Sequence, residues 1–350
     1  MKAMVLNKTA SLAENPQPLE LTELPDPVAG DNEVLLKVRT CGVCHTELDE
    51  IEGRLQPPRF PLVLGHQVVG EVLQAGKKVT LHRPGDRVGV GWIDSACGHC
   101  RYCLEGNENL CAEFRATGYD NNGGYAEKMV VDERFAYALP GSLSDIHTAP
   151  LLCAGAIGYR SLRLTELKNG EPLGLTGFGA SAHLVLQMAS HLFPDSPIYV
   201  FARNPEEREF ALQLGAAWAG DTTEFPTLLL DAIIDTTPVW FPVVSALERL
   251  APGGRLVINA IRKEDVDKDA LLQLDYPNHL WREKEIKSVA NVARNDVIDF
   301  LKLAAELNIQ PEVERYTLED ANRALVELKN KHVRGAKVLV IDETGRQGNG

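Results

Sequence analysis

A chain of 350 residues that is 44% hydrophobic and 24% charged has room for two domains with separate cores, which excludes disordered and fibrous proteins. Its formal net charge of -13, with no cluster of Lys and Arg, argues against nucleic acid as a partner. No apolar run reaches the roughly 18 residues needed to cross a bilayer, and Met1–Ala10 lacks a secretory signal. We therefore expect a cytoplasmic protein with no membrane partner.

The first part of the chain, to about residue 150, predicts a domain rich in β-strands and loops. Short alternating apolar runs such as Glu33–Val38 and Val68–Val72 are typical of half-buried strands. Pro and Gly punctuate these runs, as in Pro84–Asp86 and Asn122–Gly124, and predict tight turns between them.

From about residue 155 the pattern changes to short apolar strands that alternate with helical stretches. This alternation predicts βαβ units around a parallel, doubly wound sheet. A good helix, Ala182–Ala189, separates the first two of the four strand candidates, which are Leu173–Thr176, Ile198–Phe201, Ala232–Asp235 and Arg255–Ile258.

The last part of the chain predicts two further helices and a closing strand. The helices span Val297–Ala305 and Glu319–Leu328, and the strand spans Lys337–Ile341. Gly345–Gly350 is polar and rich in glycine, which is typical of a frayed tail.

Seven cysteines in such a chain indicate metal binding, because the cytosol keeps thiols reduced and disfavours disulfides. Four of them are crowded into one short segment, namely Cys97, Cys100, Cys103 and Cys111. A single loop can turn four sulfurs around a tetrahedral zinc ion, and Gly98 and Gly106 supply the backbone freedom. The alternatives are unliganded buried cysteines and an iron–sulfur cluster, but the segment lacks the ferredoxin spacing and its trailing Pro. We predict a structural zinc site whose shell the four sulfurs complete without His99.

A glycine-containing turn in the second part of the chain predicts a dinucleotide site. The segment from Gly177 to Ala182 follows a predicted strand and opens a predicted helix, which is the context of a dinucleotide fingerprint. Backbone N–H groups at such a helix N-terminus favour a bound pyrophosphate. The predicted cofactor-binding residues in this turn are Gly177, Gly179, Ala180, Ser181 and Ala182.

The cofactor choice depends on the end of the second predicted strand, Phe201-Ala202-Arg203-Asn204. The acid that binds an unphosphorylated ribose is missing there, and Arg203 supplies a planar cation for the 2′-phosphate of NADP(H). An exposed Arg203 without a ligand is the alternative, and the nearby Glu206 and Glu207 would repel a phosphate. We predict an NAD(P) cofactor, with NADP(H) favoured over NAD(H).

Several separate motifs occur along the chain in a familiar order. They are Cys41-Gly-Val-Cys44-His-Thr46-Glu47-Leu-Asp49, Gly65-His66-Gln67 with Gly70, the four-cysteine segment, and Leu152-Cys153-Ala154-Gly155. Together they resemble the zinc-containing alcohol dehydrogenases of the medium-chain dehydrogenase/reductase superfamily over nearly the whole chain. The resemblance implies a GroES-like catalytic domain at residues 1–155, completed by 292–350, and a Rossmann cofactor-binding domain at 156–291.

The resemblance also implies a catalytic zinc ion held by Cys44, His66 and Cys153. Two thiolates and one neutral imidazole leave a tetrahedral zinc with one open position for substrate, which is what catalysis requires. The competing interpretation of Cys41-x-x-Cys44 is a redox pair, but no short βαβ context surrounds it. We interpret Cys41 as a small buried hydrophobic residue.

Further roles follow from the same resemblance. Thr46 takes the position whose hydroxyl contacts the substrate oxygen and begins a proton relay, and Asp49 takes the place where the relay often ends in His. Trp92 takes the position of an aromatic wall of the substrate pocket, with plain core packing as the alternative. Gln67 stands where many relatives have Glu, and Glu47 stands where an Asp often orients the zinc-binding His.

The resulting prediction is a zinc-dependent oxidoreductase that transfers hydride between a small alcohol and NAD(P)+, with two zinc ions per chain. A zinc polyol or sugar dehydrogenase is the alternative enzyme, and a non-catalytic protein on the same scaffold is the alternative from another class. Small alcohols, aldehydes or ketones are the expected partners, and the resemblance implies a homodimer or homotetramer.

Overall fold

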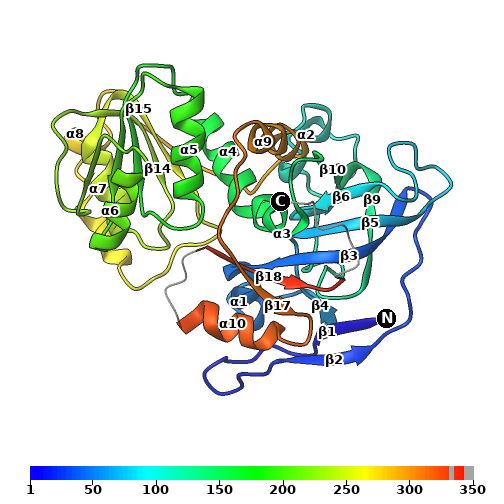
Figure 1. Ribbon diagram of the computed structural model, residues 1–350. Coiled ribbons are helices and arrows are strands. Elements are labelled where there is room, and N and C mark those ends of the chain that lie inside the picture. Colours follow the sequence, from blue (N-terminus) through cyan, green and yellow to red (C-terminus); the bar gives the residue numbers. More distant parts are fainter. Residues whose placement is uncertain (331–334, 343–350) are drawn as a thin grey trace. The chain divides into compact units, whose positions relative to one another are not determined.

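The computed structural model describes residues 1–330 and 335–342 (Figure 1). The predicted frayed tail at residues 345–350 lies outside this range. The described chain forms two compact units, one from Met1–Cys153 together with the described residues from Val292 onward, and one from Ala154–Asn291. Within the described residues, no helix combines the length and apolar character needed to cross a membrane.

The first unit is built mainly on antiparallel strands, with one parallel pair between β17 and β18. A seven-stranded sheet has the order β10-β6-β5-β3-β18-β17, with β9 paired to β3, and smaller sheets have the orders β2-β1-β4 and β7-β8. The strands are β1 (Lys2–Leu6), β2 (Leu19–Glu23), β3 (Glu33–Val43), β4 (Leu62–Val63), β5 (Val68–Ala75), β6 (Arg87–Val90), β7 (Ile93–Ser95), β8 (Arg115–Ala116), β9 (Lys128–Asp132), β10 (Ala136–Ala138), β17 (Val313–Thr317) and β18 (Ala336–Val340).

Both ends of the chain contribute to this unit. Strand β18 pairs antiparallel with β3, so that Leu339 lies opposite Cys41. Along β3 the apolar side chains of Val34, Leu36 and Val38 are fully buried, and this period of two gives the sheet its core face. The helices of the unit are α1 (His45–Ile51), α2 (Arg101–Leu104), α3 (Asp145–Pro150), α9 (Arg294–Glu306) and α10 (Ala321–Asn330), with 3₁₀ turns at Glu108–Leu110 and Glu133–Phe135.

The second unit is a parallel sheet with helices, as the alternating pattern predicts. Its six strands have the order β13-β12-β11-β14-β15-β16 and all their pairings are parallel. The strands are β11 (Leu173–Thr176), β12 (Ile198–Phe201), β13 (Trp218–Gly220), β14 (Leu230–Asp235), β15 (Leu250–Ile258) and β16 (Glu285–Ser288). The helices are α4 (Ala156–Thr165), α5 (Ala182–Leu192), α6 (Pro205–Gln213), α7 (Phe241–Arg249) and α8 (Tyr276–His279), with a 3₁₀ turn at Lys268–Gln273.

The four predicted strands of this unit are confirmed as β11, β12 and the C-terminal parts of β14 and β15. Helix α6 was missed by the sequence pattern because it has little amphipathic character, yet its start has clear local signals. The Asn204 side chain accepts a hydrogen bond from the N–H of Glu206 at 2.9 Å, and Pro205 occupies the first turn.

Candidate active site

Three segments of the first unit bring two sulfurs and one imidazole together. Cys44 ends the β3 segment and caps α1, since its Sγ accepts from the Thr46 N–H at 3.4 Å. His66 lies in the loop between β4 and β5. Cys153 lies in a π-helical turn, Leu151–Gly155, and such turns are frequent at functional sites.

The three side chains have the geometry of a metal site. Their ligand atoms all lie within 4.8 Å of one another, and Cys44 Sγ is 3.8 Å from His66 Nε2. A tetrahedral zinc ion with bonds of ordinary length separates a sulfur from a nitrogen by about 3.6 Å, so the spacing fits such an ion. The Cys153 side chain, together with burial, raises the pKa of the Cys44 thiol well above its usual value, so a cation is needed to bind both sulfurs as thiolates.

The remaining nitrogen of the His66 ring is paired with Glu47. Glu47 Oε1 lies 2.7 Å from His66 Nδ1, and both side chains are buried. The geometry between His66 Nδ1 and Glu47 Oε1 is not that of an aligned hydrogen bond, and Glu47 Oε1 has no other hydrogen-bond partner within the described residues. The other carboxylate oxygen accepts from the Cys44 N–H at 2.9 Å. One glutamate therefore holds two of the three candidate ligands, and its extra methylene relative to Asp does not prevent the pairing.

The loop that carries His66 depends on a glycine. Gly65 has φ of +97°, a conformation that favours glycine, and a Cβ there would come within 2.4 Å of the Tyr125 ring. The same substitution would crowd the Cys41 sulfur at 2.8 Å. The turn can therefore press His66 close to Cys44 only when residue 65 lacks a side chain.

An aromatic row stands beside the imidazole. The Trp92 ring meets His66 edge to face, with centroids 5.2 Å apart, and Tyr119 lies on the other side of Trp92 at 6.1 Å. Trp92 is buried, while Tyr119 donates its hydroxyl hydrogen to Gln56 O. Trp92 is the aromatic residue predicted here from the sequence, whereas no local pattern distinguishes Tyr119 from other tyrosines.

The other predicted residues near this candidate metal site have distinct surroundings. Asp49 is buried and its Oδ1 accepts from Arg54 Nε at 2.5 Å, so the carboxylate is held by a cation. Gln67 packs against Gly42, where a Cβ would come within 2.5 Å of its Oε1. Thr46 lies on α1 between Cys44 and Glu47 and is partly exposed.

Glu50 is a buried acid that the sequence analysis did not identify. Its side chain lies on α1, one turn after Glu47, and is only 1% exposed. Neither carboxylate oxygen has a hydrogen-bond partner among residues 1–330 and 335–342. Burial, reinforced by the neighbouring Glu47, raises the pKa of Glu50 well above its usual value.

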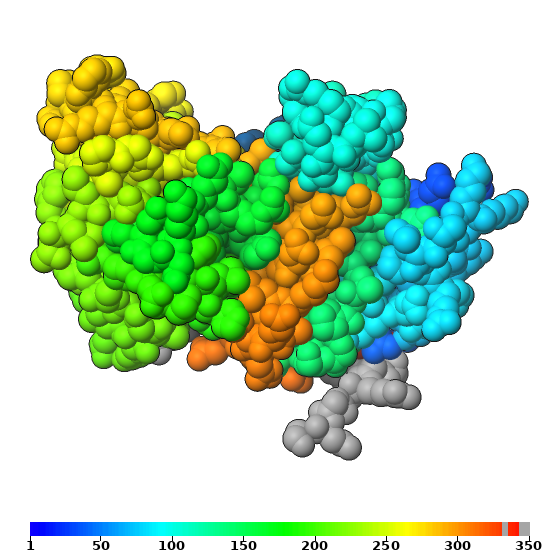
Figure 2. Space-filling view, turned by 90° about the horizontal axis from the view of Figure 1, so that it is seen from above, coloured from blue at the N-terminus to red at the C-terminus, as the bar shows by residue number. Residues whose placement is uncertain are grey.

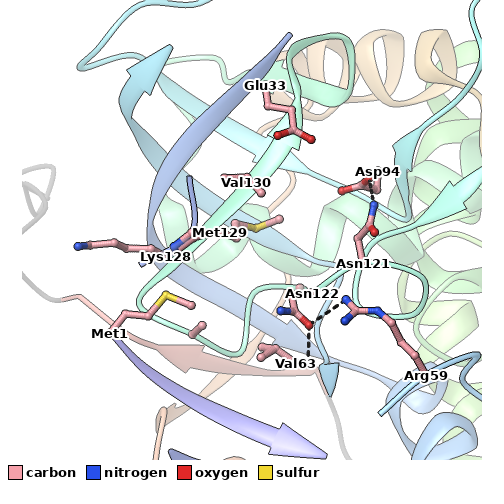
Figure 3. Close-up of a pocket in the computed structure, with 13 residues that line it drawn as sticks. Met1, Glu33, Arg59, Val63, Asp94, Asn121, Asn122, Lys128, Met129 and Val130 are labelled. Carbon is pink, nitrogen blue, oxygen red and sulfur yellow. Dashed lines mark hydrogen bonds between the residues drawn. The ribbon is translucent and has the colours of Figure 1, made fainter. Parts of the chain in front are cut away.

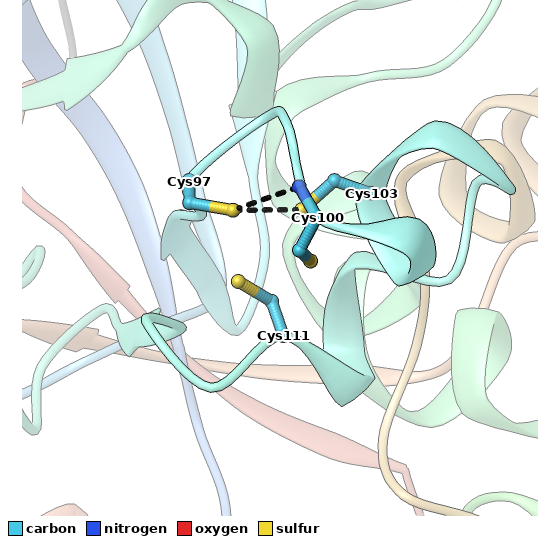
Figure 4. A group of neighbouring side chains, drawn as sticks. All are labelled: Cys97, Cys100, Cys103 and Cys111. Atoms are coloured by element: carbon cyan, nitrogen blue, oxygen red, sulfur yellow. Dashed lines mark hydrogen bonds between the residues drawn. The ribbon is translucent and has the colours of Figure 1, made fainter.

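The four-cysteine segment closes on itself as predicted (Figure 4). The sulfurs of Cys97, Cys100, Cys103 and Cys111 lie within 4.8 Å of one another. The distance of 3.8 Å between Cys97 Sγ and Cys103 Sγ equals the edge of about 3.8 Å that zinc–sulfur bonds of about 2.3 Å give a tetrahedron. The His99 and Cys100 backbone amides lower the pKa of Cys97 to about 6, which favours the thiolate that binds metal.

This segment forms a lobe of the first unit, seen as the cyan knob beside the orange helix α9 (Figure 2). Glu108 in the lobe pairs with Arg294 at the start of α9 at 3.3 Å. His99 turns back onto its own loop, with Nδ1 3.1 Å from Cys97 O. A smaller group of possible ligands, Cys97, His99 and Glu113, shares Cys97 with the four-sulfur set and is more exposed.

A separate cavity of about 230 Å³ lies in the first unit (Figure 3). Its lining within the described residues includes no predicted metal ligand. The polar and charged side chains of the lining are those of Glu33, Arg59, Asp94, Asn121, Asn122 and Lys128. Asn121 Nδ2 donates to Asp94 Oδ2 at 2.5 Å, and burial raises the pKa of Asp94 to about 6 despite this bond. The cavity therefore lies outside the metal centre.

In the second unit, the predicted glycine turn links β11 to α5. Gly177 has φ of +77°, and a Cβ there would come within 2.8 Å of Thr236 Oγ1, so only glycine fits. A Cβ at Gly179 would meet no described atom within 4 Å, which leaves that backbone open to a ligand. Among the described residues Ser181 makes no side-chain cap, so no capping side chain competes with an anion at the start of α5, although the His183 N–H already donates to Gly179 O at 3.3 Å.

The end of β12 carries the predicted phosphate-binding arginine. Ala202 is buried, and Arg203 after it is exposed. Arg208 donates to Ala202 O at 3.0 Å and lies 3.4 Å from Asp221 Oδ2, so this second arginine braces the strand end.

Comparisons with known proteins agree with this organisation. A family described as "Alcohol dehydrogenase GroES-like domain" matches residues 30–141. A probable alcohol dehydrogenase AdhA from Mycobacterium tuberculosis is 44% identical over 329 residues, covering 93% of each chain, and an alcohol dehydrogenase from Geobacillus stearothermophilus is 31% identical over 96% of this chain and 100% of its own. The solved cinnamyl alcohol dehydrogenase SbCAD4 from Sorghum bicolor has a TM-score of 0.81 at 26% identity, covering 97% of each chain.

Proposed function

This chain belongs to the zinc-containing alcohol dehydrogenases of the medium-chain dehydrogenase/reductase superfamily, and on that premise we propose that Cys44, His66 and Cys153 hold its catalytic zinc. As a family member it is an oxidoreductase that transfers hydride between an alcohol and NAD(P)+. The convergence of two sulfurs and one imidazole from three separate segments carries the proposal. The four-sulfur lobe is proposed to hold a second, structural zinc ion.

Different residues of the first unit are proposed to have different roles in the reaction. When bound, the zinc ion acidifies the alcohol and the nicotinamide takes the hydride. Glu47 holds His66 through Nδ1, which directs Nε2 toward the sulfurs and fixes the ligand set. Trp92 covers one edge of His66 and limits access of water on that side.

We propose that Thr46 and Asp49 move the substrate proton. A hydroxyl can accept one proton while it donates another, so Thr46 is suited to receive the proton of the alcohol. Asp49 lies one helical turn along the same helix and offers the next oxygen acceptor. Asp49 Oδ1 accepts from Arg54 Nε at 2.5 Å, which holds the carboxylate in place at the end of this path. Asp49→Asn should reduce turnover mainly at low pH, and an unchanged pH–rate profile would remove Asp49 from the relay.

The proposed cofactor is NADP(H). The support is chemical: β12 ends in the uncharged Ala202, and the exposed guanidinium of Arg203 follows it. A planar guanidinium suits a phosphate, whereas an acid in place of Ala202 would repel it. The glycine turn at Gly177 and the open backbone at Gly179 support the pyrophosphate.

A kinetic comparison tests the cofactor proposal. Catalytic efficiency should be higher with NADPH than with NADH, and Arg203→Leu should reduce the NADPH value about tenfold or more while leaving the NADH value nearly unchanged. Lys168→Leu is the matched control, because it removes one exposed positive charge before β11, at the opposite edge of the same sheet. A strong preference of the unmodified enzyme for NADH would refute the role of Arg203.

The proposed substrates are small primary or secondary alcohols with their aldehydes and ketones. Gln67 beside the metal ligand His66 favours this class over polyols, for which a Glu is the more typical residue. A panel of alcohols, aldehydes and polyols, measured before and after chelation, tests the proposal together with metal analysis for two zinc ions per chain. Activity that survives complete removal of the metal would refute a zinc-dependent reaction. A homodimer or homotetramer is proposed as the assembly, to be measured by light scattering.

A further inference from the structure

The carboxyl edge of the parallel sheet brings three loops of the second unit together. Strands β11, β14 and β15 are neighbours and end at Thr176, Asp235 and Ile258. The Thr236 N–H donates to Thr176 O at 2.9 Å, and the Asn259 N–H donates to Asp235 O at 2.7 Å. Open α/β sheets bind their ligands at this edge, so Asn259 lies where a dinucleotide is expected.

Asn259 carries a buried side-chain donor at this edge. The residue is 8% exposed, and its Nδ2 has no hydrogen-bond partner within the described residues. Buried polar groups are almost always paired in folded proteins, because an unpaired one loses its hydrogen bonds to water without replacement. An unpaired donor at a ligand-binding edge points to a group that arrives with the ligand.

The other polar side chains around this strand end are already engaged. Thr176 Oγ1 donates to Asp235 Oδ1 at 2.6 Å, and Thr237 Oγ1 donates to the same oxygen at 2.8 Å. Lys263 Nζ contacts Asp235 Oδ2 at 2.5 Å. Both carboxylate oxygens of Asp235 thus already accept from other groups, and the Asn259 amide has no acceptor within the described residues.

The same contacts hold Asn259 in place. Lys263 Nζ also donates to Thr237 O at 2.8 Å and Val239 O at 3.0 Å, which ties the loop after β15 to the loop after β14. Asn259 directly follows Ile258, which is paired with Asp235 of the neighbouring strand. Since the Asn259 N–H is paired with Asp235 O and the preceding strand is paired in the sheet, the residue loses little backbone freedom when it binds a ligand.

We propose that the Asn259 side-chain amide donates a hydrogen bond to an oxygen of the bound nicotinamide dinucleotide. This inference rests on the proposed function, and it assigns a cofactor contact to a residue outside the glycine turn and outside Arg203. The dinucleotide offers carbonyl, hydroxyl and phosphate oxygens, all of which accept from an amide N–H.

Fluorescence titration of the zinc-loaded enzyme with NADPH tests the contact. Asn259→Leu keeps the side-chain size and removes the donor, so its Kd for NADPH should rise on the order of fivefold. Its melting temperature should stay the same or rise, since the variant no longer buries an unpaired amide. Asn259→Asp should weaken binding further, because it replaces the donor by a negatively charged acceptor.

A matched control and two contrary outcomes complete the test. Asn169→Leu removes an amide that pairs with Asp195, before β11 at the opposite edge of the sheet, and should leave the Kd for NADPH unchanged even if stability falls. A wild-type Kd for Asn259→Leu, or for Asn259→Asp, would overturn the proposed donor. Absence of any NADPH or NADH binding to the unmodified enzyme would instead overturn the proposed function, and the Asn259 contact with it.

Discussion

Replacing Glu47 by Gln should weaken the proposed catalytic metal site while leaving the proposed structural site intact. In the structure Glu47 pairs with His66 Nδ1 through one oxygen and with the Cys44 N–H through the other. A glutamine offers one acceptor and one donor, so Glu47→Gln can satisfy only one of the two contacts. Either His66 or Cys44 therefore loses the carboxylate oxygen that orients it.

The size of the effect follows from the kind of contact. A hydrogen bond to a charged group contributes about 1.5–3 kcal/mol. The lower end applies because Glu47 Oε1 lies off the direction of the His66 N–H. About 1.5 kcal/mol corresponds to roughly a tenfold loss of zinc affinity, which agrees with the 10–100-fold range for groups that orient metal ligands.

Competition with a coloured chelator measures this loss, since it resolves a weaker and a tighter zinc ion per chain. Glu50→Gln is the matched control on the same helix. Glu50 is buried like Glu47, but neither of its carboxylate oxygens has a hydrogen-bond partner within the described residues, so this variant should keep wild-type zinc affinity. If Glu47→Gln releases zinc no more readily than Glu50→Gln, the reasoning about His66 is wrong.

Three further changes have expected outcomes. Cys103→Ser should lower the zinc content by one ion per chain and reduce the melting temperature. Cys41→Ser is the control and should retain both ions. Equal zinc content in the two variants would contradict the four-sulfur site. Asp94→Asn should stabilise the protein by up to about 3 kcal/mol above pH 6, because the folded-state pKa of Asp94 is raised from 3.8 to about 6 and only the ionised form pays the desolvation cost. This gain should disappear as the pH falls from 6 to 4, and a gain in denaturant unfolding that does not depend on pH would contradict it. Lys263→Met should destabilise the second unit by about 3–5 kcal/mol, because it leaves the buried Asp235 without its cation. Adding Asp235→Asn should recover much of this loss in thermal unfolding. A double variant no more stable than the single one would argue against the ion pair.

The departures from the common family pattern have different structural outcomes. Glu47 reaches His66 despite its greater length, whereas Asp49 is engaged by Arg54. Glu50 adds a buried acid with a raised pKa beside them. One short helix thus carries three buried carboxyl groups, and their surroundings differ because each has different partners along α1.

Local features of this protein could be predicted from the sequence. Cys97, Cys100, Cys103 and Cys111 are so close along the chain that a single loop must bring their sulfurs together. The strand–glycine–helix order at Gly177 is likewise a local pattern, because φ and the helix start depend on adjacent residues.

The tertiary structure decided the contacts that join distant segments. Nothing in the neighbourhood of Cys44 indicates that His66 and Cys153 lie beside it, and only the resemblance to a family brought them together in the sequence analysis. The burial of Glu50, the pairing of Asp49 with Arg54 and the unpaired amide of Asn259 were likewise not predicted. Periodicity and spacing report which residues are neighbours along one element, whereas desolvation and partner choice depend on elements that meet only after the sheets have formed.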